Sequence, residues 1–173
     1  MKKMFLAVLT AMIAFSFLAC TKEKSVEEML TQKKGWELTT ATCSPAYKLW
    51  SGATTTNLFE GYISSCELDD VMIFDPNYAQ ILDLGKDLCT DQSGKQLALG
   101  VWKLIDDDHL DLYLPYYPGF LLHAYILKID DEALKLQINF DEDDEVPATA
   151  YRGPKDSKTV RNYTFDLTYK VAK

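Results

Sequence analysis

The chain has 173 residues, which suits one domain with a buried core rather than two. Hydrophobic residues make up 47% and charged residues 25%, a composition that excludes a disordered chain. The formal net charge of −8 opposes contact with nucleic-acid phosphates, and the chain contains no glycine-rich phosphate cradle. We therefore expect no nucleic-acid partner and no nucleotide cofactor.

The first twenty residues read MKKMFLAVLTAMIAFSFLAC. Two lysines precede an uncharged run that is shorter than the roughly 20 apolar residues of a membrane-spanning helix. A basic end, a short apolar middle and a small residue before a break are typical of a secretory signal. Because the break is Ala19–Cys20, the segment resembles a bacterial lipoprotein signal. We expect residues 1–19 to be a signal peptide, Cys20 to carry the lipid and residues 20–25 to form a tether. The alternative is an ordinary secretory signal with a chance cysteine.

A lipoprotein signal predicts a place in a bacterial cell envelope, with the outer membrane as the expected anchoring site. An exported, oxidising location also permits disulfides. Three cysteines remain beyond the anchor, and they allow three different pairings. They are Cys43, Cys66 and Cys89.

Residues 26–173 predict one domain made mainly of strands. Ser25 and Glu28 form a capping-box pattern that favours a helix over 26–33, and Gly35 is a plausible end. Residues 57–66 are compatible with a second short helix. Period-two patterns joined by turn residues predict strands, and without alternating helices these do not form a parallel sheet. The predicted strands cover 35–43, 71–74, 78–84, 97–105, 109–114, 121–129, 133–140 and 162–173.

Three of these strands carry explicit predictions about their faces. In the first strand, alternation places Trp36, Leu38, Thr40 and Thr42 on one face. Residues 133–140 alternate most regularly and indicate a half-buried antiparallel strand. Residues 97–105 are apolar on both faces, which predicts a covered outer face or an aromatic side chain at a seam.

Gly35-Trp36 stands at the start of the first strand, and the order C-x-x-D-D, strand, turn, strand, C runs from Cys66 to Cys89. In these two stretches the chain resembles the lipocalin-like domain lipoproteins of Bacteroidetes-type bacteria. The resemblance implies an all-β fold, an eight-stranded antiparallel up-and-down barrel with a short N-terminal helix. It also implies a Cys66–Cys89 disulfide, with Cys43 left over. Such a barrel can hold one small ligand.

Few residues suggest chemistry. His109 and His123 lack the H-x-x-x-H spacing of a metal site, so a surface or core role is favoured over metal binding. The acidic runs at 106–108 and 141–145 lack the spacing of a calcium loop and fit solvated turns. We therefore expect no catalytic site, no metal and no cofactor.

Aromatic residues are the candidates for contact with a ligand or partner. Tyr116, Tyr117 and Phe120 lie in a proline-bracketed loop, where they either contact a ligand or close the barrel as a lid. Trp50 is either a plug or an exposed binding residue. The stretch 141–161 is long enough to be a functional loop.

These observations favour a non-catalytic, membrane-anchored protein that binds a small apolar or amphipathic ligand. The alternative is an envelope protein-binding lipoprotein, such as a hydrolase inhibitor or an accessory subunit, that uses its rim loops rather than the barrel interior. A cavity within the barrel favours the first function, whereas a completely filled interior favours the second.

Overall fold

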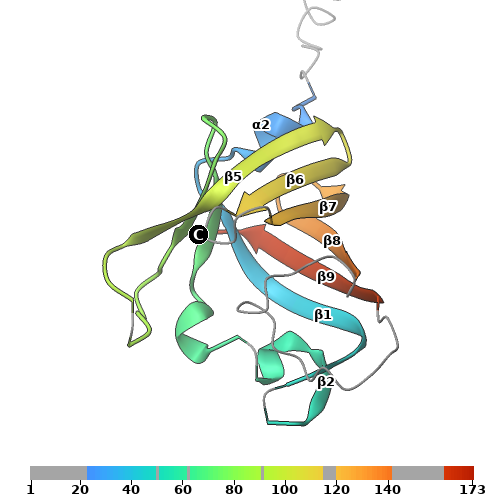
Figure 1. The fold of residues 1–173 in the computed structure, drawn as a ribbon. Helices are drawn as coiled ribbons and strands as arrows, with labels where there is room; N and C mark the ends of the chain where they lie inside the picture. Colours follow the sequence, from blue (N-terminus) through green and yellow to red (C-terminus); the bar gives the residue numbers. More distant parts are fainter. Residues whose placement is uncertain (1–22, 50, 62, 91, 115–119, 142–161) are drawn as a thin grey trace, which may run out of the picture.

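The computed structural model describes residues 23–49, 51–61, 63–90, 92–114, 120–141 and 162–173. They form an all-β domain with a closed barrel of eight antiparallel strands and a short helix on the N-terminal side (Figure 1). The elements are α2 (Val26–Leu30), β1 (Trp36–Lys48), β2 (Thr54–Asn57), the 3-10 helices η1 (Leu58–Glu60) and η2 (Ser65–Glu67), β3 (Val71–Phe74), β4 (Ala79–Asp83), β5 (Gln96–Asp106), β6 (His109–Leu114), β7 (Phe120–Ile129), β8 (Ala133–Asp141) and β9 (Asn162–Val171).

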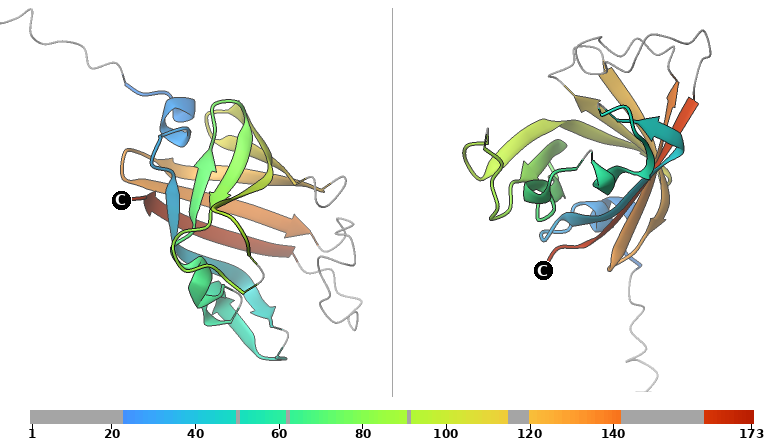
Figure 2. Two further views of the ribbon diagram at one scale, coloured as in Figure 1. Left: turned by 90° about the vertical axis from the view of Figure 1, so that its left-hand side faces the viewer. Right: turned by 90° about the horizontal axis from the view of Figure 1, so that it is seen from below.

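The barrel strands follow one another in sequence order, and the barrel closes through β1. Strand β1 pairs with β9 from Trp36 to Ser44, but it pairs with β3 only at Trp36 and Glu37. Its far half forms a hairpin with β2 at the end of the molecule opposite to α2 (Figure 1 and Figure 2). Strand β1 is thus hydrogen-bonded to β9 over most of its length, but to β3 only at its first two residues.

Helix α2 closes one end of the barrel. The predicted capping box is present, because Ser25 Oγ accepts a hydrogen bond from the backbone N–H of Glu28 and the Glu28 carboxylate accepts one from Ser25. The buried side chain of Leu30 joins the barrel core. The indole N–H of Trp36 donates to the carbonyl oxygen of Leu30 over 3.0 Å, which fastens the helix to the first strand.

The inward faces of the strands form the core. Alternate residues point inward because successive side chains of a strand lie on opposite faces. Leu110 and Leu112 of β6 are buried, and so are Leu134 and Leu136 of β8. The other buried members of this core are Leu30, Trp36, Phe74, Trp102, Ala124, Ile126, Ile138 and Tyr169.

The prediction that Thr40 and Thr42 share a face with Trp36 and Leu38 is wrong beyond Leu38. The register between β1 and β9 shifts between Leu38 and Thr40, which inserts one extra residue into β1. Such a bulge moves the following side chains to the other face of the sheet. Ala41 and Cys43 are therefore buried, whereas Thr40 and Thr42 are exposed.

Other boundaries also differ from the predictions. Helix α2 is shorter than 26–33, and β1 continues to Lys48 through residues whose turn-like composition gave no strand signal. The segment 57–66 contains two 3-10 helices rather than one helix. The outer face of β5 leaves Leu97, Val101 and Ile105 about half exposed, so no described element covers it. No helix in the described part of the chain is long and apolar enough to cross a membrane.

Candidate ligand-binding site

A cavity of about 200 Å³ lies where β1 and β3 diverge. This volume is smaller than that of most ligand pockets, which span roughly 300–1,000 Å³. The pocket therefore has room for one small molecule. The cavity is lined by Trp36, Leu38, Ile63, Glu67, Asp70, Met72, Leu82 and Tyr169.

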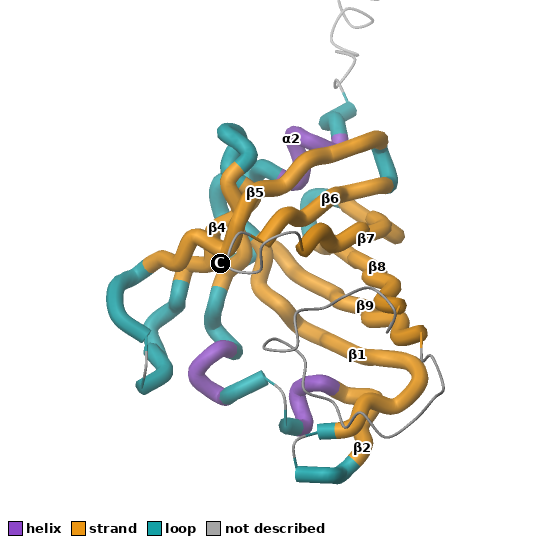
Figure 3. The backbone as a smooth tube through the Cα atoms, viewed as in Figure 1, coloured by secondary structure: helices purple, strands orange, loops and turns teal. Residues whose placement is uncertain are grey.

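The segment between β2 and β3 forms one wall of this cavity. It carries η1 and η2, and Figure 3 shows both short helices (purple) between these strands. Leu58 and Ile63 anchor the segment by packing near Ala41 and Cys43 of β1. The bulge in β1 directs Ala41 and Cys43 inward, so it also creates the surface against which this segment packs.

The two adjacent aspartates that precede β3 have different surroundings. The carboxylate of Asp69 accepts hydrogen bonds from the backbone N–H groups of Lys86 and Asp87, at 2.7 and 3.4 Å. The chain passes so close that a Cβ at Gly85 would collide with this carboxylate. Asp69 therefore holds the chain after β4 in place, whereas Asp70 lines the cavity.

Asp70 is the least satisfied polar group of the cavity wall. Asp70 is only 7% exposed, and its side-chain oxygen Oδ1 has no hydrogen-bond partner. Burial raises the pKa of Asp70 from 3.8 to about 6, with smaller contributions from the charges of Asp69, Glu67 and Asp83. At neutral pH most molecules thus hold a charged carboxylate with an unpaired oxygen beside an apolar cavity, a costly arrangement unless a ligand pairs with it.

Two further polar groups lie in the cavity wall. Glu67 is fixed by its position in η2, because its carboxylate accepts a hydrogen bond from the backbone N–H of Ser64 over 2.7 Å. Burial raises the pKa of Tyr169, so its phenol stays protonated. The wall therefore offers two carboxyl groups and one hydroxyl group against a mainly apolar background.

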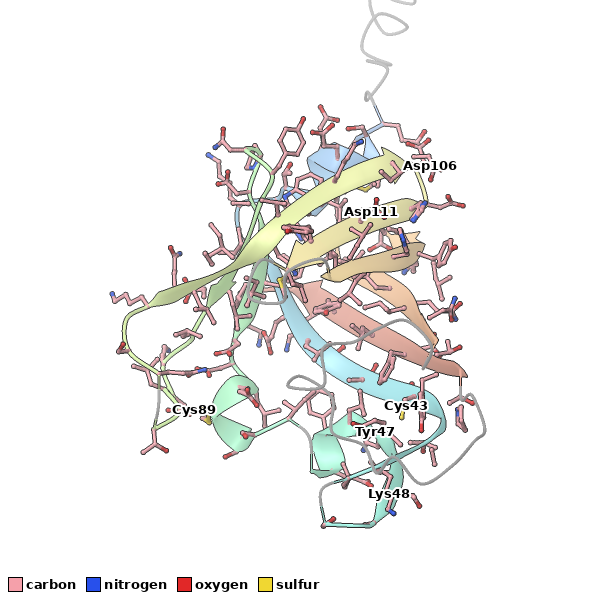
Figure 4. All side chains as sticks on the ribbon, viewed as in Figure 1. Cys43, Tyr47, Lys48, Cys89, Asp106 and Asp111 are labelled. Atoms are coloured by element: carbon pink, nitrogen blue, oxygen red, sulfur yellow. A yellow bond between two sulfur atoms is a disulfide. The ribbon has the colours of Figure 1, made fainter. Side chains whose placement is uncertain are left out.

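A disulfide between Cys66 and Cys89 supports the acidic wall. It links η2 to the chain that follows β4, with a Cα–Cα distance of 5.3 Å, as the resemblance implied. Figure 4 labels Cys89 at this link and Cys43 far away on β1. Cys43 is a buried free thiol, 3.5 Å from the carbonyl oxygen of Thr55. Because Glu67 follows Cys66 directly, the disulfide fixes the part of the segment between β2 and β3 that carries Glu67.

The binding roles that the sequence predicts for Trp50, Tyr116, Tyr117 and Phe120 stay predictions. Trp50, Tyr116 and Tyr117 lie outside the described residues, as do Cys20 and the range 142–161. Phe120 is the first residue of β7 and its backbone pairs with Leu114, but its side chain is outside the described set. The rim-loop alternative therefore also stays a prediction.

Sequence reasoning used the C-E-L-D-D motif only as a sign of the fold and missed its place in the cavity. Cys66 and Asp69 do have structural roles, but Glu67 and Asp70 line the cavity. The available signal was the pair Asp69-Asp70 directly before the apolar strand β3. Because adjacent side chains near a strand point in different directions, one of the two carboxylates is expected to face the core. The sequence does not show which of the two aspartates turns inward.

The two histidines, predicted to be separate surface or core residues, are neighbours. His109 lies on β6 and His123 on β7, and both approach Asp111 on the outer face of the barrel. Both histidines face away from the barrel interior, because the next residues along their strands, Leu110 and Ala124, face the core.

Comparisons with known proteins found no match: no protein-family model matches the chain, and neither a curated protein nor a solved structure matches it.

Proposed function

We propose that this protein is a non-catalytic, membrane-anchored barrel that binds a small amphipathic molecule carrying a basic group. The supporting observation is the carboxyl group of Asp70, a buried residue that lines a pocket of about 200 Å³ and whose pKa burial raises to about 6. A cationic group in the pocket would offset the cost of the charge on this carboxylate. The apolar part of the ligand would replace water against Trp36 and Leu82.

The charge and size of the cavity define the ligand class. Asp70 and Glu67 both present carboxyl groups, so an anionic ligand would meet repulsion. The volume admits a short alkyl amine or a single-ring amine, but not a long lipid chain. Hydrogen bonds to charged groups contribute about 1.5–3 kcal/mol, enough to separate a cation from a neutral molecule of the same shape.

Three probes of similar shape test the charge preference. Hexylamine, hexanol and hexanoate share an alkyl chain and differ in the charge of the head group. We expect hexylamine to bind most tightly by titration calorimetry and to shift the NMR signal of the Trp36 indole. Equal binding of all three probes, or preference for hexanoate, would contradict the proposed ligand class.

Replacing Asp70 with asparagine is expected to weaken hexylamine binding roughly 10- to 100-fold, because the charge-assisted hydrogen bond is lost. Binding to the unmodified chain should also fall about tenfold between pH 7 and pH 5, since Asp70 becomes protonated as pH drops through its pKa of about 6. The Asp70→Asn variant should lose this pH dependence. Asp87→Asn, an exposed acid outside the cavity, is the matched control, and its binding should be unchanged.

The same substitution has a separate effect on stability. The pKa of Asp70 in the folded chain lies above its ordinary value of 3.8, so the folded state binds more protons than the unfolded state between pH 4 and pH 6. The contribution of Asp70 to stability therefore falls as pH rises through this window. Without ligand, Asp70→Asn should raise the melting temperature at pH 7 and leave it nearly unchanged at pH 4.

The membrane anchor rests on the signal-like segment that ends at Cys20. Replacing Cys20 with alanine is expected to move the protein from the membrane fraction to the soluble fraction, because the acyl chains have no attachment site. Incorporation of labelled palmitate should be lost in parallel. Cys43→Ala should keep both properties, and an unchanged fractionation of Cys20→Ala would contradict the anchor.

A further inference from the structure

The outer face of β6 and β7 brings together two imidazoles and a carboxylate. His109 and Asp111 are two residues apart on β6, so both point away from the core, as the buried side chains of Leu110 and Leu112 show. His123 lies directly opposite Asp111 in the register of β6 with β7. Figure 4 labels Asp111 on β6.

One atom from each side chain forms a triangle with two nearly equal sides and one shorter side. His109 Nε2 lies 3.4 Å from His123 Nδ1 and 3.3 Å from Asp111 Oδ1. His123 Nδ1 lies 2.7 Å from the same Asp111 Oδ1. All three potential ligand atoms are therefore close enough to one another to contact a single ion.

The size of this triangle matches one face of a zinc coordination tetrahedron. Zinc binds imidazole nitrogen and carboxylate oxygen at about 2.0–2.2 Å, which places two ligand atoms of a tetrahedron about 3.3 Å apart. Two of the three observed distances equal this value within about 0.1 Å, and the third is shorter. We propose that His109, Asp111 and His123 bind a divalent transition metal of the zinc class, with the fourth position open to solvent.

The scaffold holds these side chains close to the geometry that a metal needs. The Tyr125 ring stacks on His109 with a centroid distance of 5.3 Å and an angle of 15°, which fixes the imidazole plane. The side chains of His109 and Asp111 are only 25% and 19% exposed, whereas that of His123 is 54% exposed. A metal would thus approach from the His123 side, and little rearrangement of β6 would be required.

Metal binding would also resolve a crowded set of polar atoms. Without a metal, both imidazoles compete for the same carboxylate oxygen, and their nitrogens face each other at 3.4 Å. A metal ion takes the place of the ring protons, so each nitrogen contributes a lone pair and the carboxylate balances part of the charge. Lys103 lies opposite Asp111 on β5 and would reduce the metal affinity through its positive charge.

Zinc titration of the purified full chain tests the proposal. His109 and His123 are the only histidines, so two-dimensional NMR of the imidazole groups reports on this site directly. We expect one zinc ion per chain to shift both rings together, and cobalt in its place to give the visible absorption of a tetrahedral complex. If neither ring shifts in a saturating excess of zinc, the proposal is overturned.

Substitutions at the site provide a second measurement. His123→Gln should weaken zinc binding by more than the roughly 10- to 100-fold that the loss of a supporting group costs, because it removes a ligand. The pair His109→Gln and His123→Gln should abolish the one-to-one complex. Cys43→Ser and Asp107→Asn should keep it, which separates the site from the free thiol and from the neighbouring acidic turn. An affinity that is unchanged in the paired variant would overturn the proposal, and melting curves confirm folding.

Discussion

Replacing Trp102 with alanine is expected to lower the free energy of unfolding by about 3–5 kcal/mol. Its side chain is almost fully buried and packs edge-on against Phe74, with ring centroids 5.7 Å apart. The indole N–H donates to the carbonyl oxygen of Asp75 over 3.0 Å and so ties β5 to the turn between β3 and β4. Alanine would leave a cavity and an unmet hydrogen bond at once, and chemical denaturation measures the loss.

Two matched variants separate these contributions. Trp102→Phe keeps most of the buried area but loses the N–H group, so it should cost less than the alanine variant. Val101→Ala changes the neighbouring residue, which is 50% exposed, and should alter stability by no more than about 0.5 kcal/mol. A Trp102→Ala variant that unfolds at the same denaturant concentration as the Val101→Ala variant would contradict the assigned core position.

Removing the Cys66–Cys89 disulfide is expected to lower the free energy of unfolding by about 3 kcal/mol, because the unfolded chain gains the freedom of a loop of more than twenty residues. The paired variant Cys66→Ala and Cys89→Ala should also bind hexylamine more weakly. The physical reason is that Glu67 and Asp70 lie in the segment that the disulfide anchors, so their carboxyl groups would become less well placed.

Reduction of the unmodified chain provides the control for this pair of substitutions. A reducing agent should lower the stability of the unmodified chain to that of the paired variant and should have no effect on the variant itself. The reducing agent should also lower the stability of the Trp102→Ala variant, since that variant retains the disulfide. If reduction and substitution differ by several kcal/mol, the side chains rather than the covalent link are responsible.

Most of the fold was predictable from local patterns. The strands β6 and β8 alternate apolar and polar residues over their whole length, and this alternation is a direct consequence of burying one face of a sheet. The capping box at Ser25 and the hairpin of β3 and β4 are equally local, because the residues that specify them are neighbours in sequence. The pairing of Cys66 with Cys89 was available only through the resemblance, since three cysteines leave three choices.

The bulge in β1 and its consequences were not predictable in this way. A single inserted residue reverses the inward face after Leu38, and no residue type marks that position in the sequence. The reversal buries Cys43 and supports the segment that carries Asp70. The cavity thus depends on where β1 leaves β3, which is decided by packing between segments distant in sequence.

The amino-acid sequence by itself determined an all-β domain, its short helix and most of its strands, because these follow from hydrophobic periodicity and from residues close together in the chain. Only the tertiary structure decided which acid faces the core and which histidines meet. Asp70 and Asp69 are adjacent and chemically identical, yet backbone N–H groups from beyond β4 hold one, and burial raises the pKa of the other. His109 and His123 meet Asp111 because the register of β6 with β7 places them there. Register and burial are properties of the closed barrel, since each strand's position depends on both of its neighbours.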